Sequence, residues 1–175
     1  MKKSVLLSVA LFLLLQINTA AQTAVSVNGD FKNGAVVING VSFTKKSTLE
    51  EYEKVLGKAE RIERIGNKDK IFAYDKLGIA LSLENNSTRV EEIYITYIFD
   101  GDRKVAKEAF TGTLSVNGES ITTQTTHEQI KELAGVDLVT VMKGFYIGKG
   151  RILHLIVYYP ESTMGQFGFS FTAIK

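Results

Sequence analysis

The chain has 175 residues, with 21 Lys and Arg against 19 Asp and Glu, one proline and no cysteine. Two of the basic residues, Lys2 and Lys3, belong to a segment that we expect to be removed, so the rest of the chain carries 19 charges of each sign. This balance, with no basic stripe, excludes nucleic-acid binding that depends on a positive surface. The missing cysteine excludes disulfides and lipid attachment at a processed N-terminal cysteine.

The first 21 residues predict a cleavable signal peptide. Lys2 and Lys3 precede an apolar run over 5–15, and small residues at 19–21 favour cleavage before Gln22. A membrane anchor would need about 20 apolar residues. We therefore expect a periplasmic or secreted protein, without a membrane span after signal cleavage, whose partner is an unknown envelope or extracellular protein.

The mature chain contains a segment that occurs twice. Asn39–Gly57 returns as Asn117–Gly135 without a gap, with seven of 19 positions identical. Such self-similarity predicts a tandem pseudo-repeat. We divide the chain into the signal peptide 1–21, an N-terminal extension 22–34, repeat unit 1 over 35–110 and repeat unit 2 over 111–175, and expect the two units to pack as one body.

Each unit begins with two predicted strands joined by an Asn-Gly turn, at Asn39-Gly40 and at Asn117-Gly118. Apolar residues on both sides of Asn-Gly favour a tight type I′ hairpin. A third, more degenerate copy of this pattern occurs over 25–31.

A short helix follows each hairpin. Ser47 or Thr48 can cap the first helix, and Thr125 or Thr126 can cap its copy, with an acidic or amide residue three positions later. Gly57 and Gly135 are expected to end the helices in the left-handed conformation.

After each predicted helix, apolar residues recur at every second position instead of about every 3.6 residues, which is the pattern of a β-strand. The mixed-charge stretch 58–70 is interpreted as a solvated connection. Three strands are then expected in each unit: over 71–74, 78–84 and 90–99 in unit 1, and over 138–146, 150–159 and 165–174 in unit 2. Pro160 falls where a strand should end. The predicted fold class is α+β, with each unit one short helix packed on an antiparallel β-meander.

The segments STLEEYEKVLGKAERI, YDKLGIALSL and VEEIYITY resemble the repeat unit of the β-lactamase inhibitor protein fold. They also resemble the small lipoprotein of the outer-membrane β-barrel assembly machinery. FTGTLSVNGESI (Phe110–Ile121), together with STLEEYEKVLG, resembles an uncharacterised family of bacterial secreted proteins with a domain of unknown function, over most of 35–175. The chain lacks the lipoprotein's cysteine and has no match to the inhibitor's contact residues. The resemblance implies a fold and the binding of proteins or peptidoglycan-proximal partners, not a reaction.

Residues typical of catalytic or metal sites are few. The two histidines, His127 and His154, have no partner at ligand spacing, because Glu128 should point about 100° away from His127 around the helix. Gly148-Lys149-Gly150 lacks the framework of a phosphate loop, and Ser170 lies in a predicted strand. We therefore predict no catalytic, metal or cofactor site.

The sheet face turned away from the helices is the candidate binding surface. Alternation along the strands places its residues opposite those that face the helices. An open face that carries Tyr and Ile is typical of a protein-binding surface. The five candidates are Tyr94, Thr96, His154, Ile156 and Tyr158. Alternatively, the two sheets or the segment 22–31 could cover this face.

The predicted function is a non-catalytic, secreted or periplasmic protein-binding module. Two alternatives stay open. One is an enzyme that acts on a cell-envelope polymer through a dispersed site, which would need a deep pocket with several carboxylates. The other is a structural subunit of a homo-oligomer.

Overall fold

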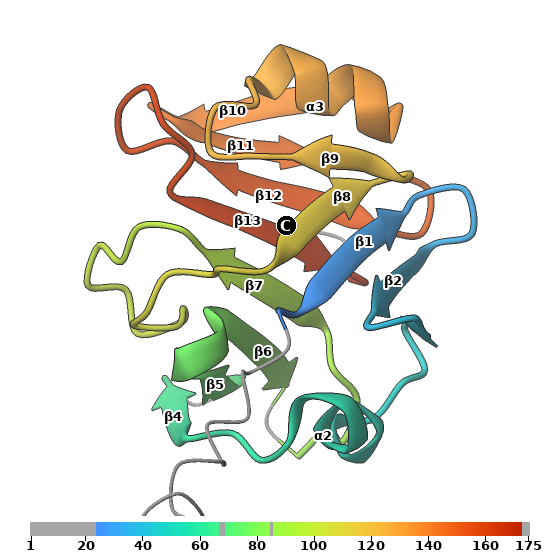
Figure 1. Cartoon of the computed structure of the whole chain (residues 1–175), viewed down its shortest axis with the longest axis vertical. Helices are drawn as coiled ribbons and strands as arrows, with labels where there is room; N and C mark the ends of the chain where they lie inside the picture. Colours follow the sequence, from blue (N-terminus) through green and yellow to red (C-terminus); the bar gives the residue numbers. More distant parts are fainter. Residues whose placement is uncertain (1–23, 67–68, 85, 173–175) are drawn as a thin grey trace, which may run out of the picture.

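Two β-sheets and two short helices make up the computed structural model, which describes residues 24–66, 69–84 and 86–172 (Figure 1). The predicted signal peptide, residues 1–21, lies outside the described residues. The mixed α+β fold class is confirmed, and the pairing between strands is mostly antiparallel.

The larger sheet has eight strands in the order β10-β11-β12-β13-β7-β6-β5-β4. Every pair of neighbours in it is antiparallel. The bounds are β4 Arg61–Ile65, β5 Asp69–Tyr74, β6 Ile79–Glu84, β7 Glu92–Thr96, β10 Leu138–Met142, β11 Phe145–Gly148, β12 His154–Tyr158 and β13 Gln166–Ser170, with a 3₁₀ turn, η1, at Asp75–Leu77.

The smaller sheet has five strands in the order β3-β2-β1-β8-β9. Its bounds are β1 Ser26–Asp30, β2 Ala35–Ile38, β3 Val41–Phe43, β8 Thr113–Val116 and β9 Glu119–Ile121. The predicted N-terminal extension, 22–34, contains β1, which pairs antiparallel with β2 and parallel with β8. The extension therefore joins the strands of the two predicted units.

Both predicted hairpins are confirmed. Asn39 and Asn117 have φ values of 49° and 51°, and the glycine after each is also left-handed, as a type I′ turn requires. The third Asn-Gly pattern was wrong as a turn, since Asn28 and Gly29 lie inside β1. Gly29 is needed for packing, because a Cβ there would overlap the ring of Phe169.

The two helices are α2 (Leu49–Leu56) and α3 (His127–Ala134), and both begin where the caps predict. The Glu51 carboxylate accepts a hydrogen bond from the Thr48 N–H at 2.7 Å, and Thr126 and Gln129 form the reciprocal box. Gly135 ends α3 in the left-handed conformation, whereas Gly57, with φ 83° and ψ −163°, ends α2 differently from the prediction.

The strand prediction needs two corrections. The stretch 58–70, interpreted as a solvated connection, contains β4, whose alternating charges are compatible with an edge strand. The segment 138–146, expected to form one strand, belongs to the hairpin of β10 and β11, which turns at Gly144 (φ 76°). Within the described residues, four strands, not three, follow each helix.

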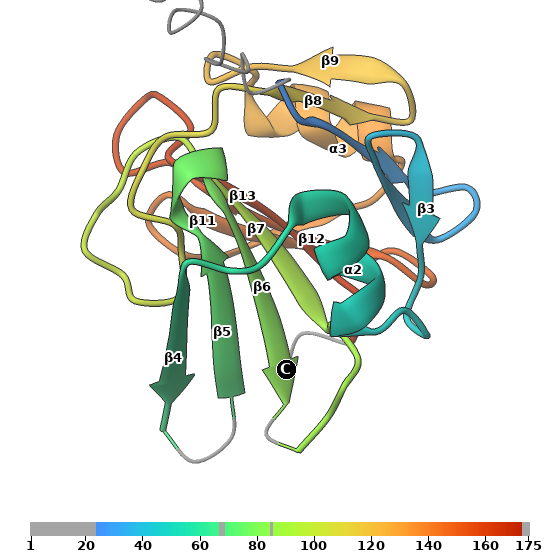
Figure 2. The ribbon, with the colours of Figure 1, turned by 60° about the horizontal axis from the view of Figure 1, so that its bottom comes forward.

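The main core lies between the two sheets. The five-stranded sheet and both helices occupy the same face of the eight-stranded sheet (Figure 2). Buried residues from β1, β2, α2, α3 and the eight-stranded sheet form one cluster, so residues of both predicted units contribute to it. We call this face of the larger sheet the inner face and the opposite one the outer face.

Candidate functional site

The outer face carries a second, smaller apolar cluster. Its buried members are Ile71, Ala73, Ala80, Tyr94, Val105 and Ile156, with Ile65 and Phe145 packed against them. Tyr94 and Ile156 are both opposite Gly168 in the sheet. A Cβ at Gly168 would lie 3.3 Å from both side chains, so the glycine lets them close over β13.

The connection between β7 and β8, residues 97–112, covers the outer face over β5–β7. Val105 and Ala106 are buried, and Val105 belongs to the outer cluster. The Ala106 N–H donates a 3.1 Å hydrogen bond to Thr96 Oγ1, which explains how a polar side chain is fully buried there. This connection thus serves as a cover for the first half of the face.

An ion-pair network around Arg61 holds the cover in place. The Arg61 guanidinium donates two 3.0 Å hydrogen bonds to the Asp75 carboxylate and a 2.9 Å bond to the Val105 carbonyl. Glu63 accepts from both Arg61 and Arg103. The hydrogen bonds from Arg61 lower the pKa of Asp75, and the Arg103 hydrogen bond lowers the pKa of Glu63.

The other half of the outer face, over β10–β12, is open at its edge. Cross-strand pairing places Val139, Ile147 and Ile156 in one row, and Met142, Phe145 and Tyr158 in the next. Ile147 and Ile156 are buried, so we call the four accessible residues of these rows, Val139, Met142, Phe145 and Tyr158, the open face. Val139 is 56% and Met142 63% exposed, so nothing in the described part of the chain covers this end as 97–112 covers the other.

The two edge strands of the large sheet differ in chemistry. β4 reads RIERI, and Arg61 and Glu63 engage the cover, while β10 reads LVTVM and has no charge. Val141, at an irregularity in β10, is also 54% exposed. Charged residues protect edge strands against pairing, whereas an uncharged apolar edge is available for contact.

The five site residues predicted from the sequence differ in solvent exposure. Tyr94, Thr96 and Ile156 are buried, and only His154 and Tyr158 are partly exposed. Burial and the Glu92 carboxylate raise the pKa of Tyr94, and its hydroxyl donates to Glu92 at 2.6 Å. Burial beside Lys149 lowers the pKa of His154. Residues 97–112 form the cover of the outer face. The segment 22–31, which was predicted as an alternative cover, instead contributes β1 on the inner side.

Sequence reasoning missed Val139, Met142 and Phe145. The sequence pattern predicts one long strand over 138–146, and a single strand does not show which residues become neighbours across the β10–β11 hairpin. The uncharged pattern of 138–142 was the available signal.

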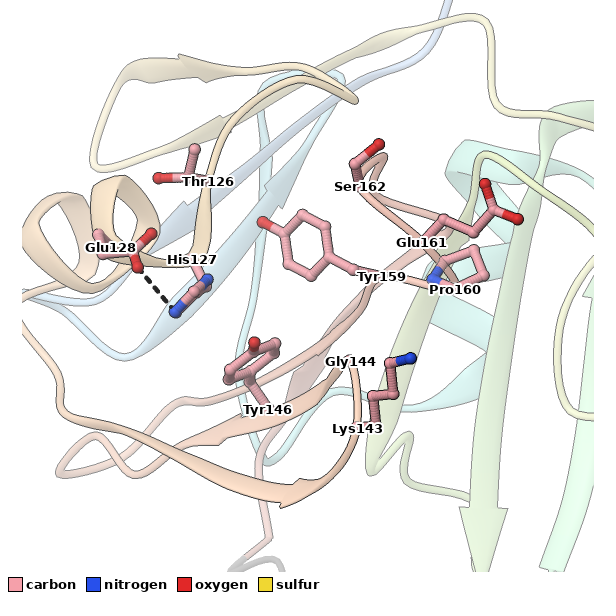
Figure 3. A pocket seen from close by; sticks show the side chains of 10 residues that line it. All are labelled: Thr126, His127, Glu128, Lys143, Gly144, Tyr146, Tyr159, Pro160, Glu161 and Ser162. Atoms are coloured by element: carbon pink, nitrogen blue, oxygen red, sulfur yellow. Dashed lines mark ion pairs between the residues drawn. The ribbon is translucent and has the colours of Figure 1, made fainter.

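A pocket of about 590 Å³ lies on the inner side, where α3 begins (Figure 3). It is lined by Thr126, His127, Glu128, Lys143, Gly144, Tyr146, Tyr159, Pro160, Glu161 and Ser162. The His127 and Tyr146 rings stack at 4.3 Å and 17°, and Tyr159 meets Tyr146 edge-on at 6.0 Å. The prediction that Glu128 points away from His127 was wrong, because the two side chains meet.

His127 Nε2 lies 2.9 Å from Glu128 Oε1. The 100° offset applies to the directions in which the two side chains leave the helix, and the flexible Glu128 side chain can still reach the imidazole that is stacked on Tyr146. Among the residues that the structure describes, no group of three or more His, Asp or Glu side chains could hold a metal ion. No described helix is long and apolar enough to cross a membrane.

Comparisons with known proteins identify a family but no activity. The model of DUF7738, a domain of unknown function, matches residues 30–131. A DUF4309 family protein (YjgB) from Bacillus subtilis is similar in structure, with a TM-score of 0.48 and 14% identity over 81% of this chain and 90% of that one. An extracellular protein containing a SCP domain from Bacillus anthracis has a TM-score of 0.46 and 10% identity, over 71% of this chain and 43% of that one. The search of curated proteins gives no significant match.

Proposed function

The chain belongs to the DUF7738 family, a domain of unknown function, and we propose that it is a non-catalytic, secreted or periplasmic protein-binding module. Its binding surface is the open face of β10–β12. One observation carries this proposal: the first half of the outer face has its own cover, whereas the second half leaves Val139 and Met142 exposed.

The chemistry of the open face supports a protein partner. Phe145 and Tyr158 are partly exposed and their rings lie 6.4 Å apart, so they provide rigid aromatic surface. Such residues lose little conformational entropy on binding and are common at the centres of interfaces. A partner segment over this face would bury Val139 and Met142, much as residues 97–112 bury the outer cluster.

Three finer statements belong to the same proposal. The halves are taken as copies of one unit, which is supported by the matched order of hairpin, helix and four strands. The resemblance to the β-lactamase inhibitor fold and the assembly lipoprotein is consistent with binding rather than catalysis. The extracytoplasmic location rests on the predicted leader 1–21.

Lysine substitutions on the open face test the proposal. Val139→Lys and Met142→Lys should each weaken capture of the partner from envelope extract by about tenfold or more, because a charge is then desolvated in the interface. Both positions are exposed, so the midpoint of thermal unfolding should change little. The measurement is quantitative mass spectrometry of proteins retained on the immobilised mature chain.

The matched control is Ile62→Lys, since Ile62 in the opposite edge strand is 62% exposed. It should retain the wild-type partner set. Equal recovery of every partner by all variants would reject the open face as the binding surface. Release of soluble envelope fragments would favour the enzyme alternative, and a stable oligomer by sedimentation would favour the structural subunit.

A further inference from the structure

The pocket at the start of α3 is a second site, separate from the open face. Tyr146 lies between Phe145 and Ile147 on β11, so its side chain points to the inner side while theirs point to the outer side. At about 590 Å³, the pocket has the size of small-molecule sites. It can therefore be occupied independently of a protein on the open face.

The aromatic wall of the pocket is held rigidly. The Tyr159 hydroxyl donates a 2.6 Å hydrogen bond to the Thr125 carbonyl, just before the helix cap. The Tyr159 N–H donates to the Gly144 carbonyl at 2.7 Å, which fixes the β10–β11 turn against the end of β12. His127 stacks on Tyr146 and pairs with Glu128. A wall fixed before binding costs little entropy when a ligand arrives.

The polar groups around this wall have both signs. Lys143 can only donate hydrogen bonds, Glu161 can only accept them when ionised, and the Ser162 hydroxyl can do both. Figure 3 shows Lys143 and Glu161 across Tyr159 from His127. Two carboxylates, Glu128 and Glu161, disfavour a phosphate or another anion, and the charged rim disfavours a wholly apolar ligand.

We propose that this pocket binds a neutral saccharide. A pyranose ring has apolar C–H faces that can pack against the accessible surface of the stacked His127–Tyr146 pair, which the buried Tyr159 supports edge-on. Its hydroxyls both donate and accept. It therefore satisfies Lys143 and Glu161 together without adding a net charge to the site. The ligand is a sugar unit of a glycan or a free oligosaccharide, and these sources share the recognised chemistry.

NMR titration of the mature chain with chitotetraose, cellotetraose and maltotetraose tests the proposal. At least one should give saturable shifts of the Tyr146 and His127 ring signals. Tyr146→Ala should raise the Kd by about tenfold or more, and Lys143→Gln by a smaller factor. Lys143 lies in an exposed turn, so Lys143→Gln keeps the test valid if Tyr146→Ala perturbs the fold. Comparing the tetrasaccharides with polymeric chitin and cellulose in a sedimentation assay distinguishes free from polymeric sources.

Phe99→Ala, at a 43% exposed aromatic that does not line the pocket, is the control and should leave the Kd unchanged. Val139→Lys should also leave it unchanged, which separates this inference from the proposed function. Absence of ring shifts with every saccharide up to about 10 mM would overturn the proposal, since weaker affinities fall below specific recognition. Saturable binding of the dipeptide Lys-Lys in place of the sugars would overturn it too.

Discussion

Replacing Phe169 by alanine is expected to lower the free energy of unfolding by about 3–5 kcal/mol, as is typical of a buried Phe truncated to Ala. Phe169 is fully buried in β13, where its cross-strand partners are Ile93 and Leu155. Its ring also lies directly over Gly29 of the smaller sheet. The substitution therefore removes contacts within the larger sheet and between the two sheets.

Urea unfolding followed by circular dichroism measures this loss. Phe99→Ala is the control, because Phe99 is partly exposed and should cost less than about 1 kcal/mol. Gly29→Val should also destabilise the protein, since its side chain would collide with the ring, and Phe169→Ala in the same chain should relieve part of that cost. A loss below about 1 kcal/mol for Phe169→Ala would contradict a core shared between the sheets.

Replacing Arg61 by methionine should loosen the cover over the first half of the outer face. The change removes two hydrogen bonds to Asp75, one to Glu63 and one to the Val105 carbonyl. It leaves the partly buried Asp75 carboxylate with the Lys107 N–H as its remaining partner. Hydrogen bonds to charged groups contribute about 1.5–3 kcal/mol each when they are well shielded, and less where solvent screens them. We expect a net loss of about 2 kcal/mol, with faster exchange of the Ala106 amide, which is bonded to Thr96.

Arg64→Met is the matched control, because Arg64 is an exposed arginine of the same strand. It should leave the Ala106 exchange rate and the unfolding free energy nearly unchanged. Hydrogen exchange followed by mass spectrometry reports the Ala106 exchange rate, and urea titration reports the unfolding free energy. If Arg61→Met and Arg64→Met behave alike, the network does not hold the cover.

The Arg61 network should also make stability depend on acid pH. Its hydrogen bonds depress the pKa of Asp75 in the folded state below the unfolded value of about 3.9. The stabilisation is therefore present above pH of about 4 and is lost as the pH falls through the folded pKa. Asp75→Asn should flatten this part of the profile of unfolding free energy against pH. An unchanged slope would contradict the contribution of Asp75 to the acid dependence.

Local features of the fold could be predicted from the sequence. Asn-Gly turns and capping boxes depend on neighbouring residues alone, so Asn39, Asn117, Thr48 and Thr126 were placed correctly. β4 was missed because its charges are typical of a solvated segment, although in the structure Arg61 and Glu63 are bonded to the cover and its neighbours.

The candidate surfaces could be predicted only in part. Alternation placed Tyr94 and Ile156 on the face opposite the helices, but their burial depends on Val105, far away in sequence. The stacking of His127 on Tyr146 likewise joins the start of a helix to a later strand. No local pattern determines which loop covers a sheet face, so the open face became visible only with the complete sheet order.

The most direct test of the binding surface is photo-crosslinking from the open face inside the cell envelope. A photoreactive phenylalanine analogue at Phe145, which is partly exposed beside Tyr158, would report what lies over this face. The same analogue at Ile62, in the opposite edge strand, is the control. We predict a discrete crosslinked protein from position 145 and none from position 62. No adduct from position 145, or the same adducts from both positions, would contradict the assignment of the open face as the protein-binding surface.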